Sequence, residues 1–399
     1  MTKIAAMKSF FYISVIALLS CDNPSNQMVD YKDIHTNAIV IDTHNDILTM
    51  TMEKGHVMDN DLLGKTHSDL DRFKKGGVDV QFFSIWSDGG NVNPYDFAIR
   101  QIDSLDAVVN RNPDKLVEVK NTSEMAEVLK KGKIAGFFGL EGGHMIENDL
   151  NKLENLYNRG VRYMTLTWNN SNSWATSASD ETSGAVLEHK GLTNFGRKVI
   201  HKMNELGMIV DISHVGEQTF WDVIGTTSKP IIASHSSVYT LCPHPRNLKD
   251  VQLEAIAKNG GVVSVNFYSG YLDSTYTGKK NLFLVKHKIE YDSLLRSGTV
   301  DYLAEERLFE KYSSEVESIR APFDLVIAHV EYIIDLIGVN HVGLGSDFDG
   351  IESTPQLLDD VSTYPQITKS LLEKGYSVID INKILGGNIL RVLKSNEPI

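Results

Sequence analysis

Residues Ile39-Val-Ile-Asp42-Thr-His44-Asn-Asp46 form an apolar, β-branched run that stops at two side chains able to bind a metal ion. An apolar run without alternation is typical of a strand that is covered on both faces, as in a parallel sheet. Positions two apart in a strand face the same way, so His44 and Asp46 can point into one site while Asn45 points elsewhere. An imidazole and a carboxylate placed in this way can share one cation. Taken alone, the same residues also fit a turn with a capping aspartate and a surface histidine.

The same pattern, an apolar run followed by a residue able to bind a metal, recurs along the chain at Glu141, His214, His235 and Asp347. Eight strands are predicted, at residues 39–46, 78–86, 134–140, 161–168, 208–214, 230–235, 261–267 and 341–347. Helical periodicity is found at residues 95–131, 150–159, 194–206, 323–337 and, in two segments, 368–393. The polar stretches 47–70 and 169–188 predict loops.

Strands that alternate with helices predict an α/β fold with parallel strands and right-handed crossovers. We expect a single (β/α)8 TIM-type barrel over residues 31–399, with a charged, mostly helical insert at about 268–320. An open, doubly wound sheet is the alternative. The barrel is favoured because the candidate site residues follow the first, third, fifth, sixth and eighth strands, and these strand ends form one rim in a closed barrel.

The composition argues against one broad class of partner. The chain has 399 residues, a net charge of −13 and a pI near 5.5. Because phosphate binding needs a basic surface, this charge argues against nucleic acid as a general partner.

Residues 1–20 are typical of a bacterial lipoprotein signal peptide, since two lysines precede an apolar run that is too short to span a membrane. The end of this run, Leu18-Leu-Ser-Cys21, resembles a lipobox, so Cys21 would carry lipid and residues 21–30 would form a tether. An ordinary signal peptide and a buried apolar helix are the alternatives. We expect an exported lipoprotein that only this anchor holds to the cell envelope, on the periplasmic or outer-surface side. A homodimer is compatible with the sequence. Cys242 would then be the only thiol left, so no intrachain disulfide could form.

Six side chains make up the candidate site. They are too many for one tetrahedral zinc ion, but they suit two metals that share a carboxylate. Glu141 is the natural bridge, because Gly142 and Gly143 permit close approach of the backbone. We pair His44, Asp46 and Glu141 at one metal, and Glu141, His214 and His235 at the other. A water between the two cations becomes the nucleophile near neutral pH, and Asp347 can accept its proton. His214 and His235, each taken alone, also fit a buried structural role.

At these residues the chain resembles the membrane (renal) dipeptidase family, within the amidohydrolase-like barrels, from residue 31 to the C-terminus. The matching segments are Asp42-Thr-His-Asn-Asp46, Gly139-Leu-Glu-Gly-Gly-His144, Asp211-Ile-Ser-His214, Ser234-His-Ser-Ser237, Arg246-Asn247 and Gly345-Ser-Asp-Phe-Asp-Gly350. The resemblance implies a barrel of the metal-dependent hydrolase type and a dipeptidase with two Zn²⁺ ions, in which Glu141 bridges and Asp347 is the general acid/base. It also implies that Arg246 holds the terminal carboxylate of the substrate, a contact for which the guanidinium fork is suited.

The chain departs from the family pattern at the end of the fourth predicted strand. Animal members carry there a histidine that contacts the substrate and stabilises the tetrahedral intermediate, whereas this chain has Trp168 followed by Asn169. Neither side chain supplies a positive charge. Asn169 or Tyr268 is a candidate hydrogen-bond donor to the substrate, and simple core packing is the alternative role for Trp168.

Dipeptides are therefore the expected substrates, with L,L and L,D pairs both cleaved. The nearest enzymatic alternative is another binuclear amidohydrolase, such as an N-acyl amino acid hydrolase or a lactonase. Many of those carry His-x-His on the first strand and a carboxylated lysine on the fourth, whereas this chain has His44-x-Asp46 and Thr167-Trp168. A lipid-anchored binding protein without turnover is the alternative from another class, and the complete ligand set together with Asp347 disfavours it.

Overall fold

The computed structural model describes residues 30–184, 186–299 and 301–398. Its strands are all parallel and are β1 Ile41–Asn45, β2 Val80–Trp86, β3 Leu116–Glu118, β4 Ile134–Glu141, β5 Val161–Thr165, β6 Ile209–Asp211, β7 Ile232–Ala233, β8 Val262–Val265 and β9 Val342–Leu344. Their order in the sheet is β2-β1-β9-β8-β7-β6-β5-β4-β3, and β2 also pairs with β4. This second pairing closes β1, β2 and β4 to β9 into an eight-stranded barrel, which confirms the predicted (β/α)8 fold.

Both faces of the strands are buried, which explains their continuous apolar runs. In β4, Ala135 and Phe137 belong to the cluster inside the barrel, whereas Phe138 and Leu140 belong to the larger cluster between the barrel and its helices. This alternation follows the period of two in a strand. The barrel interior is therefore a packed core that ends below the rim.

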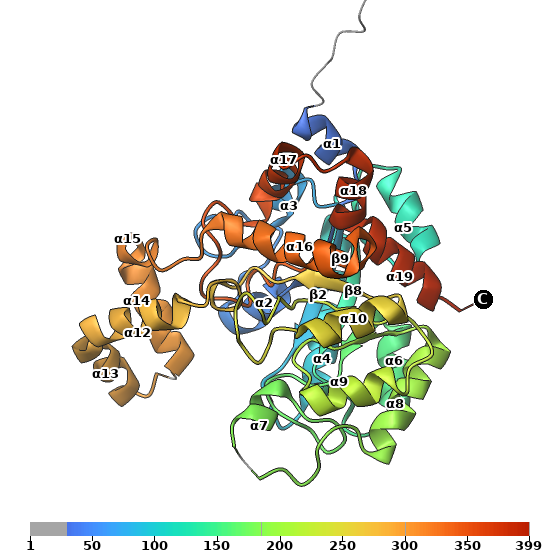
Figure 1. Cartoon of the computed structure of the whole chain (residues 1–399), viewed down its shortest axis with the longest axis horizontal. Helices are drawn as coiled ribbons and strands as arrows, with labels where there is room; N and C mark the ends of the chain where they lie inside the picture. The colour runs from blue at the N-terminus through green and yellow to red at the C-terminus, as the bar shows by residue number, and fades with distance from the viewer. Residues whose placement is uncertain (1–29, 185, 300, 399) are drawn as a thin grey trace, which may run out of the picture.

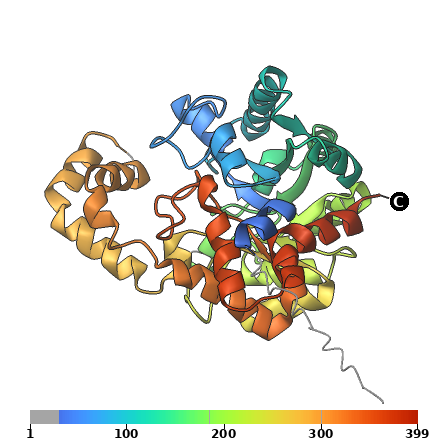
Figure 2. The ribbon, with the colours of Figure 1, turned by 90° about the horizontal axis from the view of Figure 1, so that it is seen from above.

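Helices surround the barrel on all sides (Figures 1 and 2). The principal ones are α4 Pro94–Arg111, α5 Thr122–Leu129, α6 Leu150–Asn158, α8 Asn194–Leu206, α9 Glu217–Ile224, α10 Asp250–Asn259, α16 Phe323–Ile337, α17 Pro365–Glu373, α18 Val378–Asn382 and α19 Asn388–Asn396. A single π-helical turn, Lys383–Gly387, joins α18 to α19. Among the described residues no helix is both long and apolar enough to cross a membrane.

The insert forms a helical extension beside the barrel (Figure 2). It consists of α11 Ser269–Leu272, α12 Tyr276–Lys286, α13 Lys288–Arg296, α14 Asp301–Lys311 and α15 Ser313–Val316. It has its own small apolar cluster, which includes Phe283, Leu308 and Phe309. Lys280 of α12 pairs with Glu352 of the loop after β9, so the extension is tied to the rim.

The structure corrects three of the expected segments. Residues 47–70 contain a helix, α2 Ile47–Lys54, because the Asn45 side chain accepts the Ile47 N–H and Gly55 ends the helix in a left-handed conformation. Residues 95–131 contain the strand β3, which pairs with the start of β4 before β5 joins that strand at Phe138. The expected loop 169–188 contains the short helix α7 Ala178–Thr182. Two further helices are α1 Tyr31–Asn37 and α3 Leu70–Lys75.

Candidate metal centre

The carboxyl ends of five strands deliver the six candidate ligands to one rim. His44 lies within β1 and Asp46 follows it, while Glu141 is the last residue of β4. His214, His235 and Asp347 lie two or three residues beyond β6, β7 and β9. The side chains of His44 and His235 are fully buried, and that of Asp347 is 13% exposed. The structure thus brings all six together at the predicted end of the barrel.

Glu141 lies at the centre of the cluster, and its two oxygens face different imidazoles. Its Oε1 atom lies 2.9 Å from His214 Nε2 and 3.4 Å from His235 Nε2. Its Oε2 atom lies 3.4 Å from His44 Nε2, with the Ser84 hydroxyl at 3.3 Å. This arrangement is the one that a bridging carboxylate requires.

Two groups of ligand atoms are close enough to share one cation each. The first group is His44, Glu141 and His235, and the second is His44, Asp46 and Asp347, with all atoms of a group within 4.8 Å of one another. His44 therefore lies near both His235 and Asp46, and Asp347 lies within reach of the same cation as His44. This grouping differs from the pairing expected from the sequence, which placed His235 with His214 at the second metal and left Asp347 unbound as a base.

Each histidine of the cluster uses its Nδ1 atom for a contact that points away from the cluster. His44 Nδ1 lies 2.7 Å from the Tyr163 hydroxyl, which itself donates to the Thr43 carbonyl. His214 Nδ1 lies 3.0 Å from Asn169 Oδ1, which can only accept. In both cases Nδ1 must therefore carry the hydrogen, and Nε2 presents a lone pair in the neutral ring.

His235 has the same arrangement. Its Nδ1 lies 2.8 Å from the Ser234 hydroxyl, and that hydroxyl donates to Asp211 Oδ2 at 2.6 Å. The Nε2 atoms of His214 and His235, each with a lone pair, lie 3.0 Å apart, and both face Glu141 Oε1. His44 Nε2 is buried without a hydrogen-bond partner. Lone pairs that converge without a hydrogen between them repel, so this donor set fits a cation, and the outward contacts fix the ring orientations as metal-binding histidines need.

Backbone strain accompanies two of these positions. His214 and Asp347 adopt left-handed conformations, with φ of 64° and 61°. Such conformations are uncommon for residues other than glycine and concentrate at functional sites.

The electrostatics of the cluster differ between its members. Burial and the neighbouring Arg246 lower the pKa of His214 to about 4, and burial also holds the pKa of His235 well below its usual value. Both rings are neutral near pH 7 and ready to bind a metal. Burial alone would lower the pKa of His44, but Tyr163, Glu141 and further carboxylates outweigh it and hold that pKa well above the usual value. A proton on His44 therefore competes with a cation.

The carboxyl groups of Glu141 and Asp347 also differ in the direction of their pKa shifts. Burial opposes ionisation of Glu141, but His44 and the other two histidines hold its pKa well below the usual value. Burial raises the pKa of Asp347 well above its usual value. A bound cation would reverse such a shift, because positive charge stabilises the ionised carboxylate.

Arg246 lies beside the cluster, 6% exposed, on the loop after β7. It donates to the His235 carbonyl at 3.1 Å and to the Ser236 hydroxyl at 3.3 Å, and its Nε atom is buried without an acceptor. No ion pair with an Asp or Glu is found for it among the described residues. The guanidinium lies 5.4 Å from the Tyr271 ring centre. A buried cation without a counter-charge is suited to receive an anionic group of a ligand.

Two of the other three expected substrate contacts, Asn169 and Tyr268, have hydrogen-bond partners within the protein. Asn169 orients His214, as described above, and the Tyr268 hydroxyl donates to Glu352. Trp168 is half-buried, and its ring lies 5.0 Å from the Trp86 ring and 6.5 Å from the His214 ring. Trp168 is thus the one of the three whose side chain has no hydrogen bond that ties it to another group in the described chain.

Sequence reasoning did not identify the residues that hold the ligands. Tyr163 lies in the apolar run of β5, where an aromatic residue is typical of packing, and Ser234 reads as an ordinary strand residue. The only signal in the sequence was the polar residue directly beside a candidate ligand, as in Ser234-His235.

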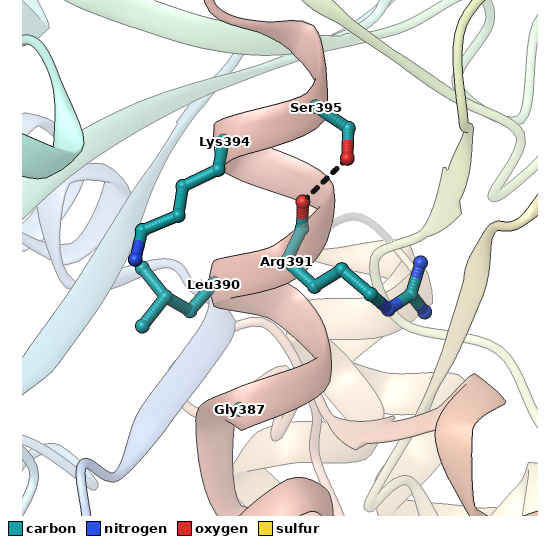
Figure 3. A pocket seen from close by; sticks show the side chains of 5 residues that line it. All are labelled: Gly387, Leu390, Arg391, Lys394 and Ser395. Atoms are coloured by element: carbon teal, nitrogen blue, oxygen red, sulfur yellow. Dashed lines mark hydrogen bonds between the residues drawn. The ribbon is translucent and has the colours of Figure 1, made fainter.

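A surface hollow of about 370 Å³ lies along α19, away from this cluster (Figure 3). Its lining residues are Gly387, Leu390, Arg391, Lys394 and Ser395. Arg391 donates to the carbonyls of Gly260 and Asn340, which precede β8 and β9, so the hollow lies at the amino ends of the strands. It offers no carboxylate or imidazole, and it is therefore not a second candidate metal site.

Several known proteins resemble this chain over most of its length. A model of the membrane dipeptidase family, peptidase family M19, matches residues 28–399. The chain is 35% identical to an uncharacterized dipeptidase of Schizosaccharomyces pombe over 92% of its length and 83% of that protein. It is 31% identical to dipeptidase aclJ of Aspergillus oryzae, over 92% of its length and 80% of that protein.

Solved structures share the fold. The probable dipeptidase PvdM of Pseudomonas aeruginosa superposes with a TM-score of 0.74 at 23% identity, over 92% of this chain and 97% of that one. A metallopeptidase of Rhodobacter sphaeroides, liganded with a phosphinate mimic of the dipeptide L-Ala-D-Ala, superposes with a TM-score of 0.73 at 23% identity, over 90% of this chain and all of that one. The resemblance predicted from the sequence is confirmed by the family model and the two relatives: the chain belongs to the membrane dipeptidase family of metallopeptidases.

Proposed function

We propose that the chain hydrolyses dipeptides, both L,L and L,D, with two Zn²⁺ ions bound at the rim of the barrel. The observation that carries this proposal is the position of Glu141, whose two oxygens face separate imidazoles and so suit a bridge between two cations. Imidazole and carboxylate donors together are typical of zinc sites. His44 and Asp46 would hold one ion with Glu141, and His214 and His235 would hold the other.

Metal ions bound in this way polarise a peptide carbonyl and acidify water, which supplies a nucleophile at neutral pH. The protein then has to move a proton. Asp347 is the proposed acid/base, because its Oδ1 atom faces the cluster and lies 3.9 Å from His44 Nε2. It accepts the proton of the attacking water and passes it to the leaving nitrogen, which departs as a neutral amine.

Arg246 is the proposed anchor for the terminal carboxylate of the substrate. Its free donors support this role, and so does the absence of an Asp or Glu counter-charge among the described residues. With the carboxylate at Arg246 and the free amino group at the cluster, the site would accommodate two residues, so longer peptides would be poor substrates. The mimic of L-Ala-D-Ala in the Rhodobacter sphaeroides relative supports acceptance of an L,D pair.

The test is an activity assay of the purified, zinc-loaded protein. We expect hydrolysis of free L,L and L,D dipeptides, loss of activity on chelation, and slow cleavage of tripeptides and of N-blocked dipeptides. Rapid cleavage of N-acyl amino acids or lactones in place of dipeptides would favour the alternative of another amidohydrolase. Tight binding of dipeptides without turnover would favour a binding protein.

We also propose that the protein is an exported lipoprotein that is anchored to the cell envelope through Cys21. The supporting signals, residues 1–20 and the tether to residue 30, lie outside the described residues except for Asp30. Cys21→Ser should release the protein from the membrane fraction or block its processing. A wild-type protein that is already soluble would contradict the anchor.

A further inference from the structure

A buried asparagine contacts the proposed acid/base. Asn266 follows β8 directly and is fully buried. Its Nδ2 atom donates to Asp347 Oδ2 at 2.8 Å, and its Oδ1 atom accepts the backbone N–H of Tyr268 at 2.5 Å. The side chain thus links the loop after β8 to the loop after β9.

The direction of the first hydrogen bond follows from the second. A backbone N–H can only donate, so the oxygen of the Asn266 amide must face Tyr268. The amide nitrogen then has to face Asp347, and the assignment of the two amide atoms is fixed by the main chain. Asn266 therefore presents a donor to Asp347 whatever the state of the rest of the site.

This contact distinguishes the two oxygens of Asp347. Asn266 holds Oδ2, while Oδ1 faces His44 Nε2 at 3.9 Å. The backbone of Asp347 is also fixed, since its N–H donates to the His44 carbonyl at 3.1 Å and its φ of 61° is left-handed. With the main chain held, the Asp347 carboxylate can still turn about its side-chain torsions, and the Asn266 hydrogen bond restricts this rotation.

Resting on the proposed function, we propose that Asn266 is a positioning residue that orients the Asp347 carboxylate, so that Oδ1 alone exchanges protons with the substrate and the attacking water. A hydrogen bond from an amide to a carboxylate is stronger than one to a neutral acceptor, which makes it suited to this task. Proton transfer requires the acceptor within hydrogen-bond reach of the reacting group, so loss of this orientation lowers the rate of the chemical step.

The test compares Asn266→Ala and Asn266→Asp with the wild type, all loaded with zinc, by kcat, KM and metal content. Asn266→Asp keeps the acceptor for the Tyr268 N–H but turns a carboxylate oxygen toward Asp347 Oδ2. We expect both variants to lose about 10- to 100-fold in kcat, the usual range for the loss of a supporting contact at a metal site. We expect KM to stay within about threefold of the wild type, because substrate anchoring is unchanged.

Asn388→Ala is the matched control. Asn388 is equally a buried asparagine, but it donates to the carbonyls of Val339 and Val342, at the other end of β9. This control should lower the midpoint of thermal unfolding and leave kcat unchanged. If the wild type is active, three results would overturn the positioning role and leave the proposed function standing. They are an unchanged kcat in the Asn266 variants, a loss of activity that comes from a higher KM or a lower metal content, and a loss of kcat in Asn388→Ala as large as that in the Asn266 variants. A zinc-loaded wild type that hydrolyses no dipeptide would refute the proposed function and this inference with it.

Discussion

Replacing Arg246 by alanine should remove the preference of the enzyme for a free carboxylate at the end of its substrate. Arg246 is 6% exposed, two of its N–H groups donate to the His235 carbonyl and the Ser236 hydroxyl, and its Nε–H has no acceptor among the described residues. It therefore has donors to offer a ligand. A hydrogen bond to a charged group contributes about 1.5 to 3 kcal/mol. That range corresponds to a factor of about 10 to 150 in kcat/KM.

The assay compares each dipeptide with its C-terminal amide. The wild type should favour the free acid by roughly this factor, and Arg246→Ala should cleave both at similar, low rates, since the amide cannot form the charged contact. Arg246→Lys keeps the charge but loses the fork geometry, so an intermediate preference is expected.

Arg162→Ala is the control. Arg162 is 7% exposed and donates to the carbonyls of Lys120, Tyr157 and Val161, far from the rim, so its loss should lower stability without changing the preference. Arg246→Ala should leave the thermal midpoint unchanged or higher, because a buried charge without a partner is itself unfavourable. An Arg246→Ala enzyme that still discriminates acid from amide as the wild type does would refute this role.

Further predictions concern Asp347, His44 and Trp168. Asp347→Asn should lower kcat by about 10²- to 10⁴-fold, the usual range for loss of an acid/base; a variant that loses metal instead would make Asp347 a ligand, as its place beside His44 and Asp46 permits. Because the pKa of His44 lies well above its usual value in the metal-free site, zinc must displace a proton from it. Metal affinity should therefore fall as the pH falls, and titration of the metal-free protein with zinc in weak buffer at pH 7 should release protons, whereas pH-independent affinity would contradict this. Trp168→Ala should raise KM roughly 5- to 30-fold if the ring covers part of the substrate, which corresponds to about 1 to 2 kcal/mol of apolar burial; a lower thermal midpoint with unchanged KM would make it a packing residue.

The barrel and its rim could be predicted from the sequence because both follow from repeated local patterns. Strands buried on both faces appear as apolar runs, and parallel strands place their carboxyl ends at one edge. A metal-binding type of residue at the end of such a run, as with Glu141 or His235, therefore lies at the rim whatever the details of the helices. The motifs at those ends also carried the resemblance to the family, which the comparisons confirm.

Other features were not predictable because they depend on contacts between distant segments. The strand Leu116–Glu118 has three residues, too few for a period of two to appear, and it exists because β4 extends below its pairing with β5. Asn169 was expected to donate to the substrate, and the contact of its oxygen with His214, 45 residues away, could not be foreseen. Asn266 gave no signal at all, since a single polar residue after a strand is common.

Whether the Glu141 carboxylate bridges two metal ions, as we propose, can be decided by a count of bound metal. The fully active, metal-loaded protein should contain two zinc ions per chain by elemental analysis. Glu141→Gln should lose both together, because the shared ligand is gone. Glu118→Gln, a change of the same kind at a half-buried glutamate at the end of β3, should keep the full complement. A result of at most one ion per fully active chain would contradict the two-metal site. A full complement of zinc in Glu141→Gln would contradict the bridging role of Glu141.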